Sequence, residues 1–277
     1  MTVLVLGARG FVGSAVKECF EASGVPVFFV STDPAGALDP KCLHVERNSE
    51  VPVDELREFL KSREIRHVIN CVNSFERTPD IAKAIEMLKV NFLFPATVLR
   101  IATEEPVTSF TNVASGWQIR PERARTAPDY VGSKEAFRQF MSAYSKKIQT
   151  RTIFVNEIFG PGDTRTKLIN SALLSWRNGE PYIVRSKESE LGLCFMPRLA
   201  DEIVQTVLGK VCRPDNYIYE NYSRISVSEV MESLKIATGI QGVWVDQGES
   251  PEGFENTQFP KLGEQGLDLL ITDLSSM

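Results

Sequence analysis

The sequence has few of the residues that hold metal ions or join chain segments covalently. Its 277 residues include two histidines and five cysteines, and no two cysteines form a C-x-x-C pair. The odd number and scattered positions of the cysteines argue against a disulfide framework, and neither His44 nor His67 has the spacing of a metal ligand. We therefore expect no metal site, no histidine-based triad and mostly buried thiols.

Long apolar runs and basic clusters are also lacking, and we expect no signal peptide. The apolar runs are strand-sized, far below the roughly 18 residues that a membrane helix needs. The first residues have neither the basic region nor the cleavage site of a signal peptide. With 31 Lys and Arg against 36 Asp and Glu, the formal net charge is -5, and the basic footprint of a nucleic-acid-binding protein is missing. These absences predict a cytoplasmic protein that binds neither membrane nor nucleic acid and takes a small molecule as its partner.

The first half alternates short, nearly continuous apolar runs with amphipathic stretches. Such runs predict strands buried on both faces, and the stretches between them predict helices that cover a parallel sheet. The predicted strands are 3–6, 27–30, 67–72, 107–113 and 152–158, and the predicted helices are 12–22, 53–60 and 130–146. The expected fold class is α/β, with a doubly wound parallel sheet.

This rhythm breaks after Phe159-Gly160-Pro161-Gly162-Asp163, where glycine and proline separate shorter elements. We predict two domains. Residues 1–160 hold the doubly wound sheet, with returning segments from the carboxy-terminal half, and residues 161–277 form a smaller α/β lobe. In the second domain, Ser226 is positioned to cap an amphipathic helix that extends to Thr238.

A glycine-rich loop follows the first predicted strand and opens the first predicted helix. Glycines in this context let the backbone approach a pyrophosphate at the amino terminus of a helix. The G-x-x-G-x-x-G spacing also occurs in plain glycine-rich turns, but the strand, the glycines and the helix together favour a nicotinamide dinucleotide. The residues of this loop expected to contact the cofactor are Gly7, Arg9, Gly10, Phe11, Val12 and Gly13.

The end of the second predicted strand bears on the choice between NAD and NADP. An acidic residue at this position binds the ribose hydroxyl of NAD and would repel the 2′-phosphate of NADP. Here the strand ends in Ser31 and Thr32, whose hydroxyls can donate to a phosphate, and Arg9 can reach the same phosphate as a cation. We therefore predict NADPH in preference to NADH. The alternative is that Asp33 folds back onto the ribose, which favours NAD.

Tyr130 and Lys134 lie four residues apart in a predicted helix. This spacing brings the phenol and the ammonium onto one helix face, where the cation lowers the pKa of the tyrosine and makes it an acid or base usable near neutral pH. The pair alone is common in proteins. Here it follows both the glycine loop and a predicted strand that leads to Ser115, and that context predicts a reactive tyrosine.

These motifs resemble those of the extended short-chain dehydrogenase/reductases, the family of NAD-dependent epimerases and dehydratases. The resemblance also includes Asn70-Cys71-Val72-Asn73, Asn91 and the turn 159–163, so it spans nearly the whole chain. More closely, Asn112-Val113-Ala114-Ser115-Gly116-Trp117-Gln118 and the segment 160–168 are similar to NADP-dependent nucleotide-sugar 4-ketoreductases such as CDP-abequose and CDP-paratose synthases.

The resemblance implies a Rossmann fold and assigns roles to individual residues. Ser115 would polarise the substrate carbonyl, with Thr111 on the same strand as a rival. Tyr130 would deliver the proton, and Lys134 would tune Tyr130 and hold the nicotinamide ribose. Further residues implied at the cofactor are Cys71, Val72, Asn73, Asn91 and Val113, and those implied at the substrate are Asn73, Trp117, Asn156, Lys167 and Arg185. Glu157 replaces the asparagine that usually binds the substrate pyrophosphate.

The implied reaction is the NADPH-dependent reduction of the C4 ketone of a nucleotide-linked 4-keto-6-deoxy sugar, a step of deoxysugar biosynthesis. Dehydratases of the family carry an Asp-Glu pair after the catalytic hydroxyl, whereas this chain has Gly116-Trp117. Two alternatives stay open: an epimerase that retains NAD, and a non-catalytic dinucleotide-binding module. The resemblance also implies a homodimer with a four-helix contact made by residues 81–102 and 130–146.

Overall fold

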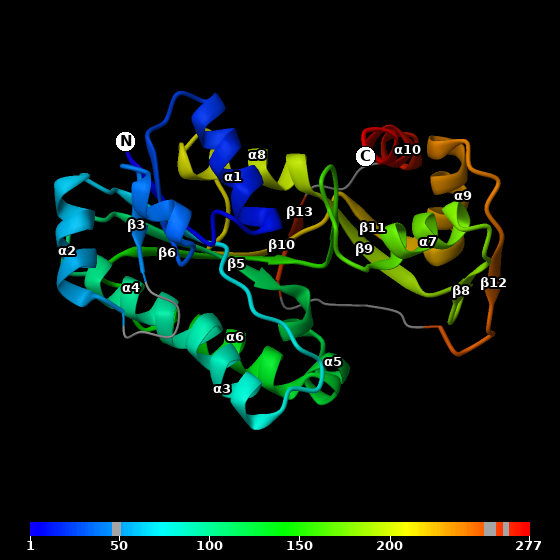
Figure 1. Ribbon diagram of the computed structural model, residues 1–277, viewed down its shortest axis with the longest axis horizontal. Coiled ribbons are helices and arrows are strands. Elements are labelled where there is room, and N and C mark those ends of the chain that lie inside the picture. Colours follow the sequence, from blue (N-terminus) through cyan, green and yellow to red (C-terminus); the bar gives the residue numbers. More distant parts are fainter. Residues whose placement is uncertain (46–50, 252–258, 263–265) are drawn as a thin grey trace. The chain divides into compact units, whose positions relative to one another are not determined.

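The computed structural model describes residues 1–45, 51–251, 259–262 and 266–277. The chain forms two compact units, each built from two segments (Figure 1). Unit 1 comprises Met1–Phe154 and Ala200–Tyr217, and unit 2 comprises Val155–Leu199 and Ile218–Met277. The chain thus leaves unit 1 a few residues before position 160, and the segment 200–217 returns to it.

The large sheet has the strand order β13-β10-β6-β5-β4-β1-β2-β3. Strands β1 to β5 lie in unit 1, whereas β13 belongs to unit 2. β1 is parallel to both of its neighbours, with Leu6 beside Val30 of β2 and Asn70 of β4. The predicted α/β fold with a doubly wound parallel sheet is confirmed. The strands are β1 (Val3–Leu6), β2 (Val27–Ser31), β3 (Cys42–His44), β4 (His67–Asn70), β5 (Ser109–Ser115), β6 (Gln149–Val155), β10 (Asn216–Tyr219) and β13 (Lys261–Leu262).

Helices cover both faces of this sheet because its strands are apolar on both sides (Figure 1). One face carries α1 (Phe11–Ala22) and α8 (Met196–Val207), and the other carries α2 (Val53–Ser62), α4 (Phe94–Ala102) and α6 (Pro128–Ser142). None of the helices in the described ranges is both long enough and apolar enough to span a bilayer. The shorter elements are η1 (Pro34–Leu38), α3 (Ile81–Leu88), the π-helical turn η2 (Lys89–Leu93), the 3-10 turn η3 (Gly116–Ile119) and α5 (Pro121–Thr126).

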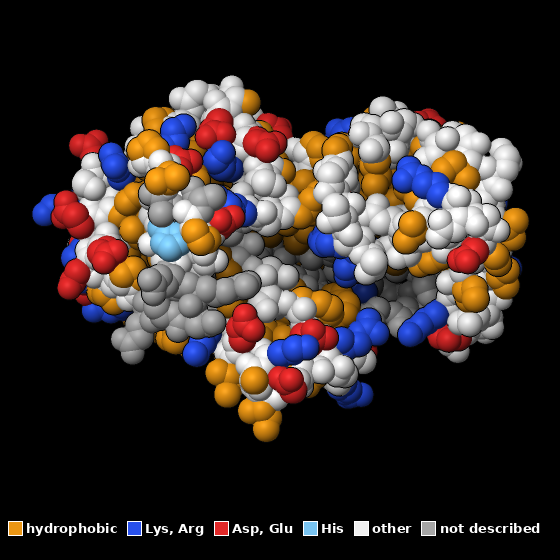
Figure 2. Space-filling view, in the orientation of Figure 1, with side chains coloured by type: hydrophobic (Ala, Val, Ile, Leu, Met, Phe, Trp, Pro, Cys, Tyr) orange, Lys and Arg blue, Asp and Glu red, His pale blue; other side chains and the backbone are white. Residues whose placement is uncertain are grey.

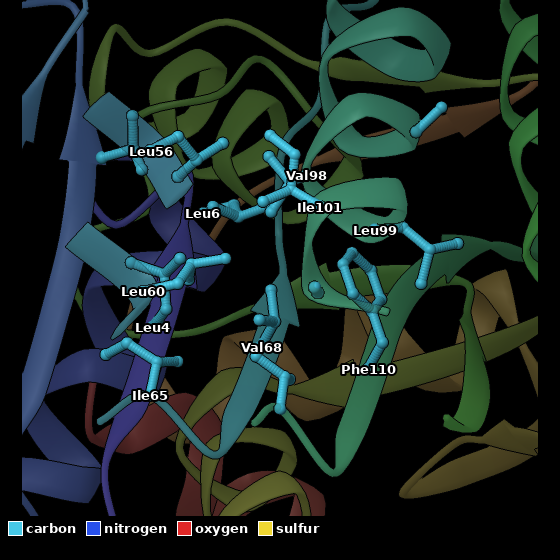
Figure 3. Packing of buried hydrophobic residues seen from close by; sticks show 14 of the residues in the cluster. Leu4, Leu6, Leu56, Leu60, Ile65, Val68, Val98, Leu99, Ile101 and Phe110 are labelled. Atoms are coloured by element: carbon cyan, nitrogen blue, oxygen red, sulfur yellow. The ribbon is translucent and has the colours of Figure 1, made fainter. Parts of the chain in front are cut away.

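The main core of unit 1 lies between the sheet and helices α2 and α4 (Figure 3). Leu4 of β1 and Phe110 of β5 face Leu56, Leu60 and Leu99 from these helices, and each of the five side chains is at most 1% exposed. Burying one such side chain stabilises the fold by about 1.5–3 kcal/mol. This core therefore fixes the carboxyl ends of β1, β4 and β5, from which the loops of the candidate site emerge.

Unit 2 contains two smaller sheets. One has the order β11-β9-β7, and the other pairs β12 with β8 in parallel. The predicted cap at Ser226 is confirmed, because its hydroxyl accepts a hydrogen bond from the Glu229 N–H at 3.2 Å and the Glu229 side chain bonds back to the cap. The elements are β7 (Glu157–Phe159), α7 (Leu168–Arg177), β8 (Tyr182–Val184), β9 (Glu190–Phe195), β11 (Tyr222–Ser226), α9 (Val227–Thr238), β12 (Trp244–Asp246) and α10 (Leu267–Ser275).

A buried carboxylate holds the last helix of unit 2. Asp273 of α10 is 5% exposed and accepts two hydrogen bonds from the Arg198 guanidinium, at 2.9 and 3.0 Å, and one from the Tyr222 hydroxyl. A buried charge is tolerated when it is paired and hydrogen-bonded in this way. The cluster therefore fixes α10 against β11 and the start of α8.

The prediction of a single strand at 152–158 is wrong, because this apolar run contains parts of two strands. β6 ends at Val155 and β7 begins at Glu157, with Asn156 between them. β6 is part of the large sheet, whereas β7 pairs with β9 of unit 2. An apolar run marks burial on both faces but carries no signal for the point at which a strand changes sheets.

His67 makes the stability of unit 1 depend on pH. Its Nδ1 lies 2.7 Å from the Ser109 hydroxyl, and burial lowers the pKa of the imidazole below its usual 6.5. The unfolded state therefore binds the proton more readily, so the contribution of this group is complete above pH 6.5 and is lost as the pH falls through the folded-state pKa.

We expect the free energy of unfolding, measured in urea, to fall less between pH 7.5 and pH 5 in His67→Gln than in the wild type. Glutamine can keep a hydrogen bond to Ser109 and has no proton to gain. An equal fall in the two proteins would contradict this role.

Candidate active site

The glycine loop forms a tight turn between β1 and α1. Gly7 has a φ of 76°, and a Cβ there would lie 3.0 Å from the backbone of Cys71 in the neighbouring strand loop. A Cβ on Gly13 would collide with the carbonyl of Gly7. The loop and the helix therefore approach each other more closely than side chains allow. Helix α1 begins at Phe11, and its N-cap residue, Gly10, makes no side-chain cap. This cradle fits the pyrophosphate of a dinucleotide.

Two opposite charges meet at the end of β2. Arg9 of the glycine loop forms an ion pair with Asp33, and both side chains are about half exposed. Ser31 is 6% exposed, and its hydroxyl accepts a hydrogen bond from the Asp33 N–H at 3.1 Å. The structure thus turns Ser31 inward, while Thr32 is exposed. The groups that the chain presents at this point are Arg9, Thr32 and Asp33.

Ser115 ends β5 and caps the turn η3. Its hydroxyl oxygen accepts a hydrogen bond from the Trp117 N–H at 3.2 Å, and this bond leaves the hydroxyl proton available to a substrate oxygen. The rival Thr111 is fully buried within the strand. Of the two hydroxyls, that of Thr111 is therefore enclosed, whereas Ser115 is partly exposed.

Tyr130 and Lys134 occupy the same face of α6, as their spacing predicts. The Tyr130 hydroxyl donates to Oδ1 of Asn73 at 3.1 Å, and Lys134 Nζ donates to the Val72 carbonyl at 3.4 Å. Both partners belong to the loop after β4. Tyr130 is 8% and Lys134 6% exposed, so α6 places a phenol and an amine against this loop.

Burial changes the acid–base properties of the site. Loss of hydration lowers the pKa of Lys134 to about 8, an effect that the neighbouring Cys71 opposes. The same cause raises the pKa of the Cys71 thiol to about 12, although Lys134 counteracts it. The lysine therefore exchanges its proton near neutral pH, and Cys71 stays protonated and unreactive.

Two aromatic rings surround the ring of Tyr130. Phe75, from the loop after β4, lies edge-on to Tyr130 with the ring centres 4.9 Å apart, and Trp117 lies edge-on to both at 6.1 and 5.5 Å. Such pairs restrict the orientation of the rings. Phe75 is 43% exposed and was not predicted as a site residue. The only signal in the sequence is an aromatic side chain two residues after Asn73.

Asn91 braces the loop from the π-helical turn η2. Its Oδ1 accepts from the Ser74 N–H and its Nδ2 donates to the Ser74 carbonyl, both at 2.8 Å. The Nδ2 also donates to the Ser133 hydroxyl on α6 at 3.1 Å. One buried amide thus joins the loop after β4 to the helix of Tyr130. Val113, implied at the cofactor, lies 6% exposed on β5.

The predicted substrate residues of unit 2 are not drawn into a single cluster. Asn156 donates from Nδ2 to the buried carboxylate of Glu220, which also pairs with Lys261 at 3.7 Å. Lys167 lies 3.9 Å from Glu157, and Arg185 is exposed after β8. Glu220 was not predicted, because a carboxylate that ends a buried strand has no recognisable sequence signal.

Residues 3–191 match the NAD dependent epimerase/dehydratase family. The chain belongs to this family. Its members are NAD-dependent enzymes. No curated protein matches the chain.

Solved structures with the same fold as this epimerase/dehydratase chain have low sequence identity to it. WbmH of Bordetella bronchiseptica in complex with NAD+ is 15% identical, with a TM-score of 0.71, over 100% of this chain and 92% of that one. UDP-N-acetylglucosamine 4-epimerase from Bacillus cereus is 13% identical, with a TM-score of 0.73, over 99% and 97%. MoeE5 in complex with UDP-glucose and NAD is 17% identical, with a TM-score of 0.72, over 100% and 97%.

Proposed function

We propose that this protein is an NADPH-dependent reductase of the C4 ketone of a nucleotide-linked 4-keto-6-deoxy sugar. The observation that carries the proposal is that Tyr130 and Lys134 both hydrogen-bond to the loop after β4, which lies beside the glycine cradle. Arg9 at the ribose end of that cradle supports NADPH, because a guanidinium pairs well with a phosphate.

Three residues of unit 1 would have separate roles in the reduction of the ketone. The nicotinamide supplies hydride when bound. Ser115 donates its hydroxyl proton in a hydrogen bond to the carbonyl oxygen, where negative charge develops. Tyr130 transfers its proton to that oxygen, and the Lys134 ammonium stabilises the phenolate that remains. No further acid or base is required.

Each unit carries residues that we propose for substrate binding. In unit 1, Asn73 and Trp117 adjoin Tyr130, and the rings of Trp117 and Phe75 offer an apolar surface to the deoxy part of the sugar. In unit 2, Lys167 and Arg185 are the proposed cations for the diphosphate, and Asn156 is a proposed amide contact. Lys167 offsets the carboxylate of Glu157, which a diphosphate would otherwise meet as a like charge.

A second candidate is a 4-epimerase that retains NAD. The exposed carboxylate of Asp33 at the end of β2 favours it, because an acidic side chain there binds the ribose hydroxyl of NAD. The similar structures include a 4-epimerase and two proteins in complex with NAD. The same Ser115, Tyr130 and Lys134 would serve this reaction.

The proposal is tested by titrating the purified protein with NADPH and with NADH and measuring binding by fluorescence. The CDP-, dTDP- and GDP-linked 4-keto-6-deoxyglucoses and UDP-glucose are then added in turn. Tighter binding of NADPH and its oxidation by one of the keto sugars are the expected results. Bound NAD with conversion of UDP-glucose and no net oxidation would support the epimerase. Binding of neither dinucleotide would contradict both enzymes, and binding without turnover would favour a non-catalytic module.

The protein would form a homodimer through a four-helix contact made by residues 81–102, which comprise α3, η2 and α4, and residues 130–146, which include most of α6. Ile81, Ile85 and Leu88 of α3 are 82%, 49% and 45% exposed, and their spacing places them on one helix face. Figure 2 shows hydrophobic side chains at the tip of α3, at the lower edge of the view. Contiguous apolar surface of this kind marks protein–protein contacts.

We expect Ile85→Glu to raise the dissociation constant of the dimer by roughly 10- to 100-fold in analytical ultracentrifugation, because a carboxylate would be buried in the contact. Ile183→Glu is a matched control, since Ile183 is 56% exposed on β8 of unit 2 and should leave the dimer intact. A monomeric wild type at all concentrations would contradict the contact.

A further inference from the structure

Gln118 joins the turn that carries Ser115 to the helix that carries Tyr130 and Lys134. Its Oε1 accepts a hydrogen bond from the Ser115 N–H at 2.9 Å, and its Nε2 donates to Oε2 of Glu135 on α6 at 3.2 Å. We propose that Gln118 is a positioning residue, which holds the Ser115 hydroxyl in place relative to the Tyr130 phenol. The proposal rests on the proposed function in that Ser115 and Tyr130 are taken as the reacting groups.

The turn around Ser115 needs such support because it is short. η3 spans four residues, Gly116–Ile119, and has 3-10 geometry. A single turn of this kind has little stability of its own, so its capping hydrogen bonds decide whether it forms. One cap is the Trp117 N–H to the Ser115 hydroxyl, at 3.2 Å, and the other is Gln118 itself. The side chain of Gln118 therefore acts on the Ser115 hydroxyl through the backbone of Ser115, to which it bonds.

The other end of the link is fixed on the catalytic helix. Glu135 directly follows Lys134, and its carboxylate accepts hydrogen bonds from Arg138 at 2.9 and 3.0 Å and from Gln139 at 2.8 Å. These bonds hold the pKa of Glu135 below its usual value, although burial acts in the opposite direction. Gln118 thus bonds to a carboxylate that is itself held in place, and hydrogen bonds to charged groups are the stronger kind.

This arrangement predicts an effect on turnover rather than on binding. Ser115 and Tyr130 act on the same oxygen, so a small shift of one relative to the other lowers the rate. The hydrogen bond from Lys134, which would hold the dinucleotide together with the glycine loop, goes to the Val72 carbonyl and does not involve the Gln118 side chain. Replacing Gln118 should therefore lower kcat and leave the affinity for NADPH unchanged.

The test uses four variants of the full chain. Gln118→Leu removes both hydrogen bonds, and Gln118→Glu keeps the acceptor for Ser115 but sets a second carboxylate against Glu135. Glu135→Gln keeps an acceptor for Gln118. In the double variant with Gln118→Glu, the new amide at position 135 donates to the new carboxylate at position 118, so the hydrogen bond between the two positions is restored in the opposite direction. We expect kcat to fall roughly 10- to 100-fold in Gln118→Leu and Gln118→Glu, and to return in the double variant to the value of Glu135→Gln.

The affinity for NADPH should stay within about twofold of the wild type in all four variants, which separates positioning from a general loss of structure. Wild-type turnover in Gln118→Leu, or no recovery in the double variant, would overturn the proposal.

Amide hydrogen exchange of the peptide that contains residues 115–119 provides a readout that needs no substrate. Faster exchange there in Gln118→Leu, with recovery in the double variant, would support the link even if the wild type reduced none of the sugars. Unchanged exchange would overturn it.

Discussion

Replacement of Tyr130 by phenylalanine should lower kcat by roughly 10²- to 10⁴-fold, the usual contribution of a positioned general acid. The substitution removes the phenol that donates to Asn73 and leaves the glycine loop and Lys134 in place. The dissociation constant for NADPH should therefore remain close to that of the wild type. Steady-state kinetics with the keto sugar and a fluorescence titration with NADPH measure the two quantities separately.

Tyr144→Phe is the matched control for this experiment. Tyr144 follows the same helix α6 and packs at the edge of the unit 1 core, where its ring contacts Phe140. It should keep full activity. Wild-type kcat in Tyr130→Phe would remove Tyr130 from the proposed chemistry, whatever the substrate.

Lys134→Met should give a protein that is more stable and almost inactive. Lys134 is 6% exposed, and burial lowers its pKa from 10.5 to about 8. Each tenfold change in proton affinity corresponds to about 1.4 kcal/mol. The folded state is therefore destabilised by about 3 kcal/mol when Lys134 is charged, which is the case below pH 8. Methionine fills similar volume without the charge, so the free energy of unfolding in urea should rise, whereas turnover and NADPH affinity should both fall.

The gain in stability should itself depend on pH. Between pH 8 and pH 10.5 the unfolded wild type binds more protons at Lys134 than the folded protein does, so the wild type becomes more stable as the pH rises through this range. The difference between Lys134→Met and the wild type should therefore be largest below pH 8 and decline above it. Lys146→Met is the control, because Lys146 is exposed. A destabilised Lys134→Met protein would contradict the cost assigned to the buried charge.

The sequence was sufficient for those parts of the fold that local pattern determines. The apolar segment 3–6 coincides with β1, and the helix predicted at 12–22 differs from α1 by one residue. The Tyr130–Lys134 spacing likewise predicted a shared helix face, because helical geometry alone fixes it.

Features that depend on contacts between distant segments could not be predicted in this way. The ion pair of Arg9 with Asp33 joins residues that are 24 positions apart. Ser31 points inward because its hydroxyl accepts a hydrogen bond from the Asp33 N–H, and no sequence pattern predicts that bond. Phe75 belongs to no motif, and Gln118, although it ends the segment 112–118 that resembles the 4-ketoreductases, was not predicted as a site residue. Their place beside Tyr130 and Ser115 follows from how the loops after β4 and β5 meet α6.

The chain path through the large sheet has a consequence for how the protein can be made. β6 and β10 are neighbours in the sheet, yet β6 ends at Val155 and β10 begins at Asn216. The sheet therefore cannot be completed until residues 156–219, which include a segment of unit 2, have been synthesised. A nascent chain released at residue 160 would present the bare edge of β6, and unpaired strand edges recruit other chains. Folding during translation should therefore finish late, and expression of the first 160 residues alone should yield aggregates.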